Sequence, residues 1–196
     1  MLDALEEAFE RPYGEFSFRR KGEVEDIRDT GSRRLAIQVE FAGSSWQTLQ
    51  LEVARPEVAE AELVPVAISI ADFRLDGPSW VACLSLRFQI AQKIHAVTEQ
   101  PEDRENVRFW DLIDLILLRE LLDEEGLGAV REACVVTFAT RGMHAWPPEL
   151  VVPGSWDGPY ASAIEDLDRA LPGSVEAAAD EVRTFIAEID AARGGI

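Results

Sequence analysis

The chain has 196 residues, and its 37 acidic side chains outnumber its 19 basic ones, which gives a formal charge of −18 at pH 7. A chain of this length can bury a core, as one large domain or two small ones. Binding to phosphate backbones depends mainly on Lys and Arg, so the acidity argues against a broad nucleic-acid-binding surface. No apolar run approaches the roughly 18 residues of a membrane-spanning helix, and the acidic N-terminus lacks a signal-peptide pattern. We expect a soluble, cytoplasmic protein without a membrane partner.

The first part of the chain has the apolar alternation of β-strands. Four apolar residues alternate with small or polar ones over 33–42, and the alternation resumes over 49–53. This period of two predicts half-buried strands, which we join as an antiparallel hairpin with a loop of three to five residues. The pairing places Glu40 and Glu52 on one face of the sheet. One or two further short strands are expected over 63–73.

The second part of the chain has the period of helices instead. From residue 84 onward apolar residues recur every three or four positions, and proline and glycine residues punctuate the pattern. Asn106 is expected to cap the N-terminus of the second helix. The expected helices run from 84 to 101, from 106 to about 124, over 127–140, over 160–170 and over 174–192. The predicted fold class is α+β, with a β-rich domain over 1–83 and a helical domain over 84–196.

Two groups of residues could contact an RNA, and each has a structural explanation as well. Basic residues gather near the start of the chain, where they form either a local phosphate-binding patch or charged loops and edge strands that resist aggregation. Aromatic residues flank a proline-rich loop, where they either stack on a base or pack the two halves together. The groups are Arg19, Arg20, Lys21, Arg28, Arg33 and Arg34, and Trp146, Trp156 and Tyr160.

The helix expected over 106–124 carries two aspartates in an apolar stretch. Asp111 and Asp114 are three positions apart and therefore lie close on one face, and Arg108 precedes them by a further three. A carboxylate in apolar surroundings needs a cation, a hydrogen-bond donor or a metal, because leaving it unpaired costs several kcal/mol. Either Arg108 satisfies Asp111 while Asp114 binds a neighbouring element, or these carboxylates take part in a reaction.

Lysine is rare in this chain, since Lys21 and Lys93 are the only lysines among the 19 basic residues of the sequence. Lys93 lies beside the apolar stripe of the first expected helix, rather than at the centre of its exposed face. A lysine in this position either extends to solvent or serves as a compact positive charge for a phosphate, a role that arginine does not duplicate. Lys93 is therefore a candidate phosphate-binding residue.

The histidines and cysteines form no recognisable site. His95 and His144 lack the spacing of a metal site, and Cys83 and Cys134 lie in apolar runs. The chain also has no Gly-x-Ser-x-Gly elbow and no Gly-rich phosphate loop. Hydrolase and P-loop functions are therefore excluded, and these four side chains are expected to be structural.

Two segments of the helical half resemble the signature of AbiEii/AbiGii-type nucleotidyltransferase toxins, the MenT-type members above all. The first is Gln-Ile-Ala-Gln-Lys-Ile-His-Ala at 89–96, and the second is Asn-Val-Arg-Phe-Trp-Asp-Leu-Ile-Asp-Leu at 106–115. The spacing of 21 positions between Lys93 and Asp114 is similar to that of the family. The resemblance extends over nearly the whole chain, through Leu51–Val53, Ala133, Cys134, Phe138, Arg141, His144–Pro148, Trp156 and Tyr160.

The resemblance implies a role for each matching residue. Lys93 corresponds to the lysine that holds the nucleoside triphosphate (NTP), and Asp114 to the essential aspartate of the helical half. Glu52 corresponds to a strand carboxylate beside the Mg²⁺ site, and Asp111 and Arg108 support the residues that bind the nucleotide. Members of the family transfer nucleotides to an RNA acceptor, typically the tRNA 3′ end, and a cognate antitoxin protein neutralises them. The chemistry requires Mg²⁺ and a charge that stabilises the departing pyrophosphate.

The chain departs from the family pattern at its start. Relatives carry a Gly-Gly or Gly-Ser turn followed by Asp-x-Asp on a strand, which supplies the first metal carboxylates, and nothing upstream of Glu40 fits that motif. The chain is expected to begin where relatives have completed it. Val107 also replaces an aspartate that relatives often place before the arginine. The leading prediction is a nucleotidyltransferase toxin, represented by its later strands and helical half, and the alternative is a non-catalytic, truncated member that acts as a binding module.

Overall fold

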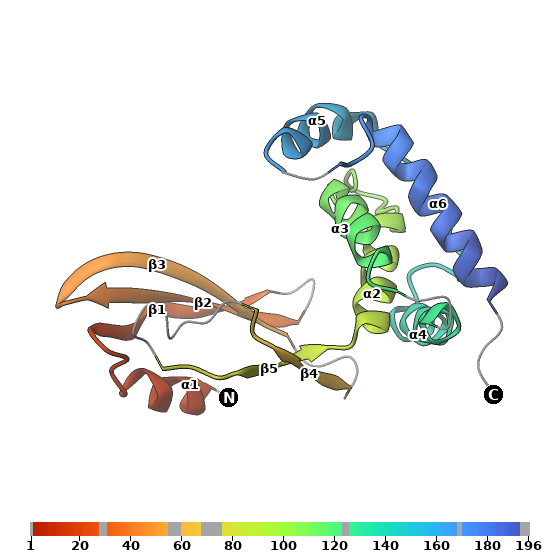
Figure 1. The fold of residues 1–196 in the computed structure, drawn as a ribbon. Coiled ribbons are helices and arrows are strands. Elements are labelled where there is room, and N and C mark those ends of the chain that lie inside the picture. Colours follow the sequence, from red (N-terminus) through yellow and green to blue (C-terminus); the bar gives the residue numbers. More distant parts are fainter. Residues whose placement is uncertain are drawn as a thin grey trace. The chain divides into compact units, whose positions relative to one another are not determined.

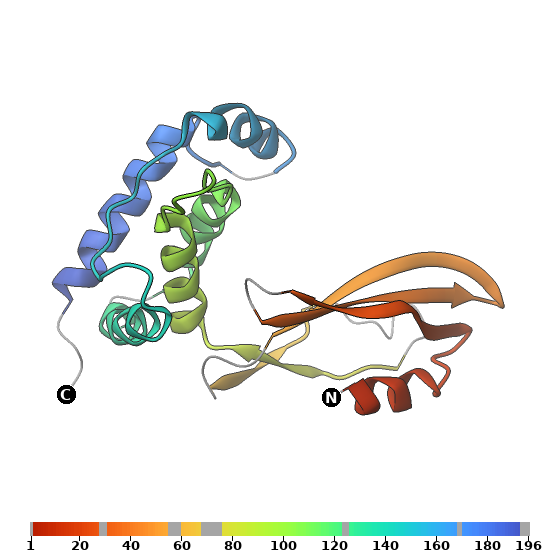
Figure 2. The same ribbon diagram turned by 180° about the vertical axis from the view of Figure 1, so that it is seen from behind.

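The computed structural model describes residues 2–27, 31–54, 60–67, 76–122, 126–167 and 170–192. The chain divides into two compact units, Met1–Cys83 and Leu84–Ile196. Antiparallel strands make up most of the first unit and helices the second, so the α+β class is confirmed (Figures 1 and 2). No helix in the described ranges is long and apolar enough to cross a membrane.

The first unit contains a short helix and two antiparallel sheets. The larger sheet has the order β1-β2-β3, and the smaller one pairs β4 with β5. Helix α1 and strand β1 were not predicted from the sequence. The charged middle of β1 has no alternating apolar pattern. Part of the strand expected over 63–73 lies outside the described residues. The elements are α1 (Leu2–Phe9), β1 (Phe16–Ile27), β2 (Ser32–Phe41), β3 (Ser44–Val53), β4 (Ala61–Pro65) and β5 (Trp80–Leu84).

Strands β2 and β3 form the expected hairpin, but with a shorter turn than predicted. Only Ala42 and Gly43 connect the strands, instead of three to five residues, and both have positive φ, at 48° and 76°. Two successive residues of positive φ are typical of a type I′ turn, whose twist matches that of the flanking strands. A bulge between Val39 and Glu40 then shifts the register of the hairpin.

The core of the sheet follows the predicted alternation. Leu35, Ile37 and Val39 on β2 are buried, whereas Phe41 at the turn is largely exposed. Gln38 on the opposite face is buried as well, and its amide hydrogen-bonds to Ser45, to Thr48 and to backbone carbonyls. These bonds satisfy a polar side chain that the alternation alone placed at the surface.

The second unit is a helical assembly in which α3 packs against α2, α5 and α6, and α4 packs against α2 and α6 (Figure 1). The predicted apolar stripe of the last helix is confirmed, since Val175, Val182, Phe185 and Ile189 are buried. Ser174 caps this helix by accepting a hydrogen bond from the Ala177 amide. The elements are α2 (Leu86–Thr98), α3 (Phe109–Arg119), α4 (Gly126–Arg141), a 3₁₀ turn η2 (Gly154–Trp156), α5 (Asp157–Glu165) and α6 (Val175–Ala191).

The aromatic residues after α4 pack within the helical unit. Trp156 and Tyr160 are fully buried, and their polar atoms donate to the backbone carbonyls of Asn106 and Pro172. The indole of Trp146 donates to the Asp190 carboxylate at 3.0 Å. Stacking on a nucleic-acid base is therefore excluded for Trp156 and Tyr160, whose rings have no accessible face.

Candidate functional site

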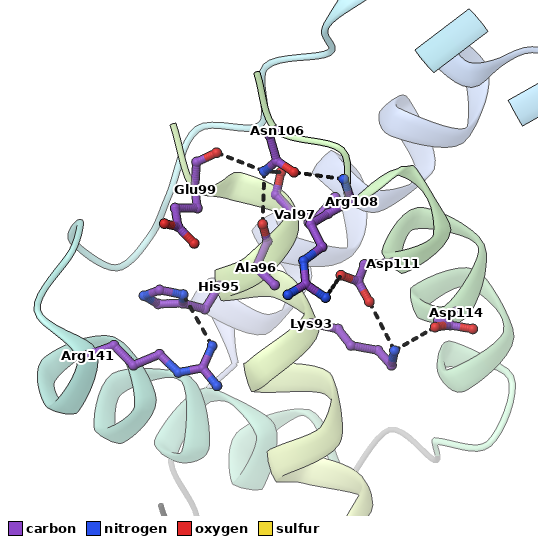
Figure 3. Close-up of polar contacts among 10 residues, drawn as sticks. All are labelled: Lys93, His95, Ala96, Val97, Glu99, Asn106, Arg108, Asp111, Asp114 and Arg141. Atoms are coloured by element: carbon purple, nitrogen blue, oxygen red, sulfur yellow. Dashed lines mark hydrogen bonds and ion pairs between the residues drawn. The ribbon is translucent and has the colours of Figure 1, made fainter. Parts of the chain in front are cut away.

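Asn106 joins the end of α2 to the start of α3 (Figure 3). Its side-chain amide lies 2.9, 3.3 and 2.8 Å from the carbonyl oxygens of Ala96, Val97 and Glu99, and so closes the C-terminus of α2. Its Oδ1 accepts from the Arg108 backbone amide at 2.8 Å. The N-cap position of α3 is occupied by Arg108, so the expected helix start at Asn106 is wrong. Asn106 instead fixes the connection between the two helices.

Lys93 reaches from α2 to both aspartates of α3 (Figure 3). Its Nζ lies 3.0 Å from Asp111 Oδ1 and 2.5 Å from Asp114 Oδ2. The two carboxylates meet one ammonium because a spacing of three positions puts them on the same side of α3. An ammonium has three N–H donors, and the third has no acceptor among the residues that the structure describes. Lys93 is thus held firmly and keeps one donor for a ligand.

The side chains of this cluster become more buried from Asp114 through Lys93 to Asp111. The Asp114 side chain is 43% exposed, that of Lys93 28% and that of Asp111 only 10%. Burial by itself lowers the pKa of Lys93, but the hydrogen bonds and negative charges of Asp114 and Asp111 outweigh it, and the net pKa is raised. Lys93 therefore remains positively charged at physiological pH, with Asp111 beneath it and Asp114 toward the solvent.

Arg108 is the outer member of the cluster. Its guanidinium lies 4.0 Å from Asp111 Oδ2, and its side chain is 64% exposed. Lys93 is the nearer cation of Asp111, and Asp114 binds this same lysine of the neighbouring helix α2, so the structural alternative holds for Asp114 but Arg108 is only the outer partner of Asp111. The sequence contained all four residues, but no local spacing relates Lys93 to the aspartates of the next helix.

Glu52 lies in the other unit, on β3. Its Oε1 accepts from the Ser32 hydroxyl at 2.5 Å, and its Oε2 pairs with Arg34 at 3.2 Å. Glu40 is six positions from this Arg34 along β2, roughly 20 Å at the rise of a strand. Glu40 therefore lies far from Glu52, and it pairs with Arg19. A guanidinium beside a carboxylate competes with a cation, and Mg²⁺ needs several oxygen ligands. Within the described ranges no three His, Cys, Asp or Glu side chains gather as a metal site, so Glu52 as placed here does not fit the implied Mg²⁺.

The basic residues near the start of the chain are neutralised by acidic neighbours. Each of four arginines on β1 and β2 forms an ion pair, and Lys21 hydrogen-bonds to Thr48. Arg28 lies outside the described residues. Because each of the four arginine charges is matched by a carboxylate, the cluster favours the edge-strand explanation over a phosphate-binding patch. The pairs are Arg19–Glu40, Arg20–Glu6, Arg33–Asp26 and Arg34–Glu52.

The two histidines meet beside the end of α2, a proximity that sequence spacing did not indicate. Their ring centroids are 4.5 Å apart, and His95 is almost fully buried. Thr98 donates its hydroxyl hydrogen to the Ile94 carbonyl, so His144 Nε2 donates to Thr98 at 2.8 Å. His144 Nδ1 is buried without a partner, and burial lowers the pKa of His144, an effect that Glu99 partly offsets. These contacts agree with the expected structural role.

The family comparison covers both units. The model of the family described as nucleotidyl transferase AbiEii toxin, type IV TA system, matches residues 1–190. The matched range includes β3 and the Lys93, Asp111 and Asp114 cluster. No curated protein matches the chain significantly.

Proposed function

Because the chain belongs to the AbiEii nucleotidyltransferase toxin family of type IV toxin–antitoxin systems, we propose that Lys93 binds the phosphates of an NTP from which this protein transfers a nucleotide. The acceptor proposed is an RNA, tRNA in particular, and a cognate antitoxin would neutralise the activity. One observation carries the proposal. Lys93 is a fixed, charged and partly exposed ammonium with a donor to spare.

The geometry suits the departure of pyrophosphate. Negative charge develops on the β- and γ-phosphates as the bond from the α-phosphate to the leaving oxygen breaks. A cation that is already in place stabilises this charge without reorganisation at the moment of reaction. Asp111 holds Lys93 from the buried side, and Asp114 fixes its direction at the surface. Asp114 is thus proposed as the positioning carboxylate of the site, and Arg108 as a second cation that supports Asp111.

The test is transfer of each α-labelled NTP to total tRNA in the presence of Mg²⁺. Removing one charge-stabilising donor typically slows such a step by roughly 100-fold or more, so Lys93→Ala should lose that much incorporation. Lys21→Ala is the matched control, because it removes the chain's other lysine, whose one polar partner among the described residues is the Thr48 hydroxyl. Asp114→Asn should also reduce transfer, since it removes one of the two charges that orient Lys93. Equal incorporation by wild type and Lys93→Ala would refute the site.

A second candidate is a non-catalytic binding module. The observation that favours it is the charge balance, because Lys93 and Arg108 are offset by Asp111 and Asp114, so the cluster can serve simply as a clamp between α2 and α3. This candidate predicts no incorporation with any NTP. It also predicts that Lys93→Ala lowers the stability of the helical unit in urea, because two carboxylates then lose their shared partner.

A further inference from the structure

Trp110 is an exposed aromatic residue on a helix whose other apolar residues are buried or half-buried. It is 50% exposed, whereas Leu112, Ile113 and Leu115 of the same helix are 0–1% exposed. The only aromatic ring described near it is that of Phe109, with centroids 5.3 Å apart. The indole N–H has no acceptor among the described residues. The core of the helical unit therefore does not explain a tryptophan at this position.

Trp110 and Asp114 are neighbours on the surface of α3. Residues four positions apart on a helix lie on one side, with roughly 6 Å between their Cβ atoms. The Asp114 carboxylate in turn touches Lys93 Nζ. A broad aromatic surface thus lies one helical turn from the carboxylate that contacts the ammonium to which the phosphates are assigned. In a nucleotide the base and the phosphates are likewise separated, by the ribose.

We propose that Trp110 is the platform on which the base of the bound NTP stacks. This inference rests on the proposed function, since it needs the phosphates at Lys93. Stacking on an aromatic ring accepts every base, because each base has a π-face, and it favours purines, which offer more area. Trp110 would therefore contribute affinity for the base and a preference for ATP and GTP over CTP and UTP.

The test separates the base from the phosphates by comparing ATP, CTP and inorganic tripolyphosphate in calorimetry. Trp110→Ala should weaken ATP binding by roughly 5- to 150-fold, the range for loss of one base–aromatic stack. It should weaken CTP binding less and leave tripolyphosphate binding unchanged. Trp110→Phe should fall between wild type and Trp110→Ala. Trp46→Ala is the matched control, because this tryptophan is 64% exposed and its ring packs against Phe16, and ATP binding should keep its wild-type affinity.

The outcomes distinguish failure of the platform from failure of the site. ATP binding that Trp110→Ala leaves at the wild-type affinity would overturn the platform, and Lys93 would stand if Lys93→Ala weakens both ATP and tripolyphosphate. Equal weakening of ATP and tripolyphosphate by Trp110→Ala would also overturn it, because Trp110 would then merely support Lys93. If the wild-type chain binds neither ATP nor tripolyphosphate, both the proposed function and the platform are refuted.

Discussion

Replacing Asn106 by alanine should destabilise the helical unit by about 3 kcal/mol. The side chain offers two N–H donors to the carbonyls at the end of α2 and accepts one bond from the Arg108 amide. Each of these three bonds contributes about 1 kcal/mol net. Alanine supplies none of them, so the carbonyls of Ala96 and Glu99 and the Arg108 amide must find water or remain unpaired.

Urea unfolding followed by far-UV circular dichroism measures this loss, since it reports mainly on the helices. Gln100→Ala is the matched control, because it removes an exposed amide from the same connection, and such surface changes usually stay within about 0.5 kcal/mol. A loss below about 1 kcal/mol for Asn106→Ala would refute the reasoning, because water would then replace the side chain at little cost.

Three further predictions concern buried polar groups in the helical unit. Burial lowers the pKa of His144 from its usual 6.5, so the unfolded chain binds this proton more readily, and stability should fall as the pH drops below about 6.5. His144→Gln should flatten this part of the profile in urea titrations, and a profile identical to wild type would contradict it. Burial raises the pKa of the Cys134 thiol to about 12, so a thiol reagent should label Cys83 in the native chain and Cys134 only after unfolding. Labelling of both thiols in the native chain would be inconsistent with that burial. Tyr160→Phe removes one hydrogen bond to a backbone carbonyl and should cost about 1 kcal/mol in urea, whereas an unchanged midpoint would show that the bond adds nothing.

Local patterns in the sequence were sufficient to predict much of the fold. The alternation over 33–42 and 49–53 predicted the β2–β3 hairpin, and the period of α6 predicted its buried face, because both patterns depend only on neighbouring residues. Strand β1 was not predicted, because its polar middle has no such period. The turn at Ala42 and Gly43 was predicted too long, since Ala42 adopts a positive φ that its residue type rarely favours.

The motif residues of the candidate site were also visible in the sequence, but their partners were not. Lys93 is 18 and 21 positions from the aspartates that it binds, and Asn106 is 7 to 10 positions from the carbonyls that it closes. His95 and His144 are further apart still. Whether such residues meet depends on how α2 packs against α3 and α4, and that packing follows from the burial of many side chains together. The sequence determined which chemical groups the helices carry, and only the tertiary structure decided which of these groups form ion pairs and hydrogen bonds with one another.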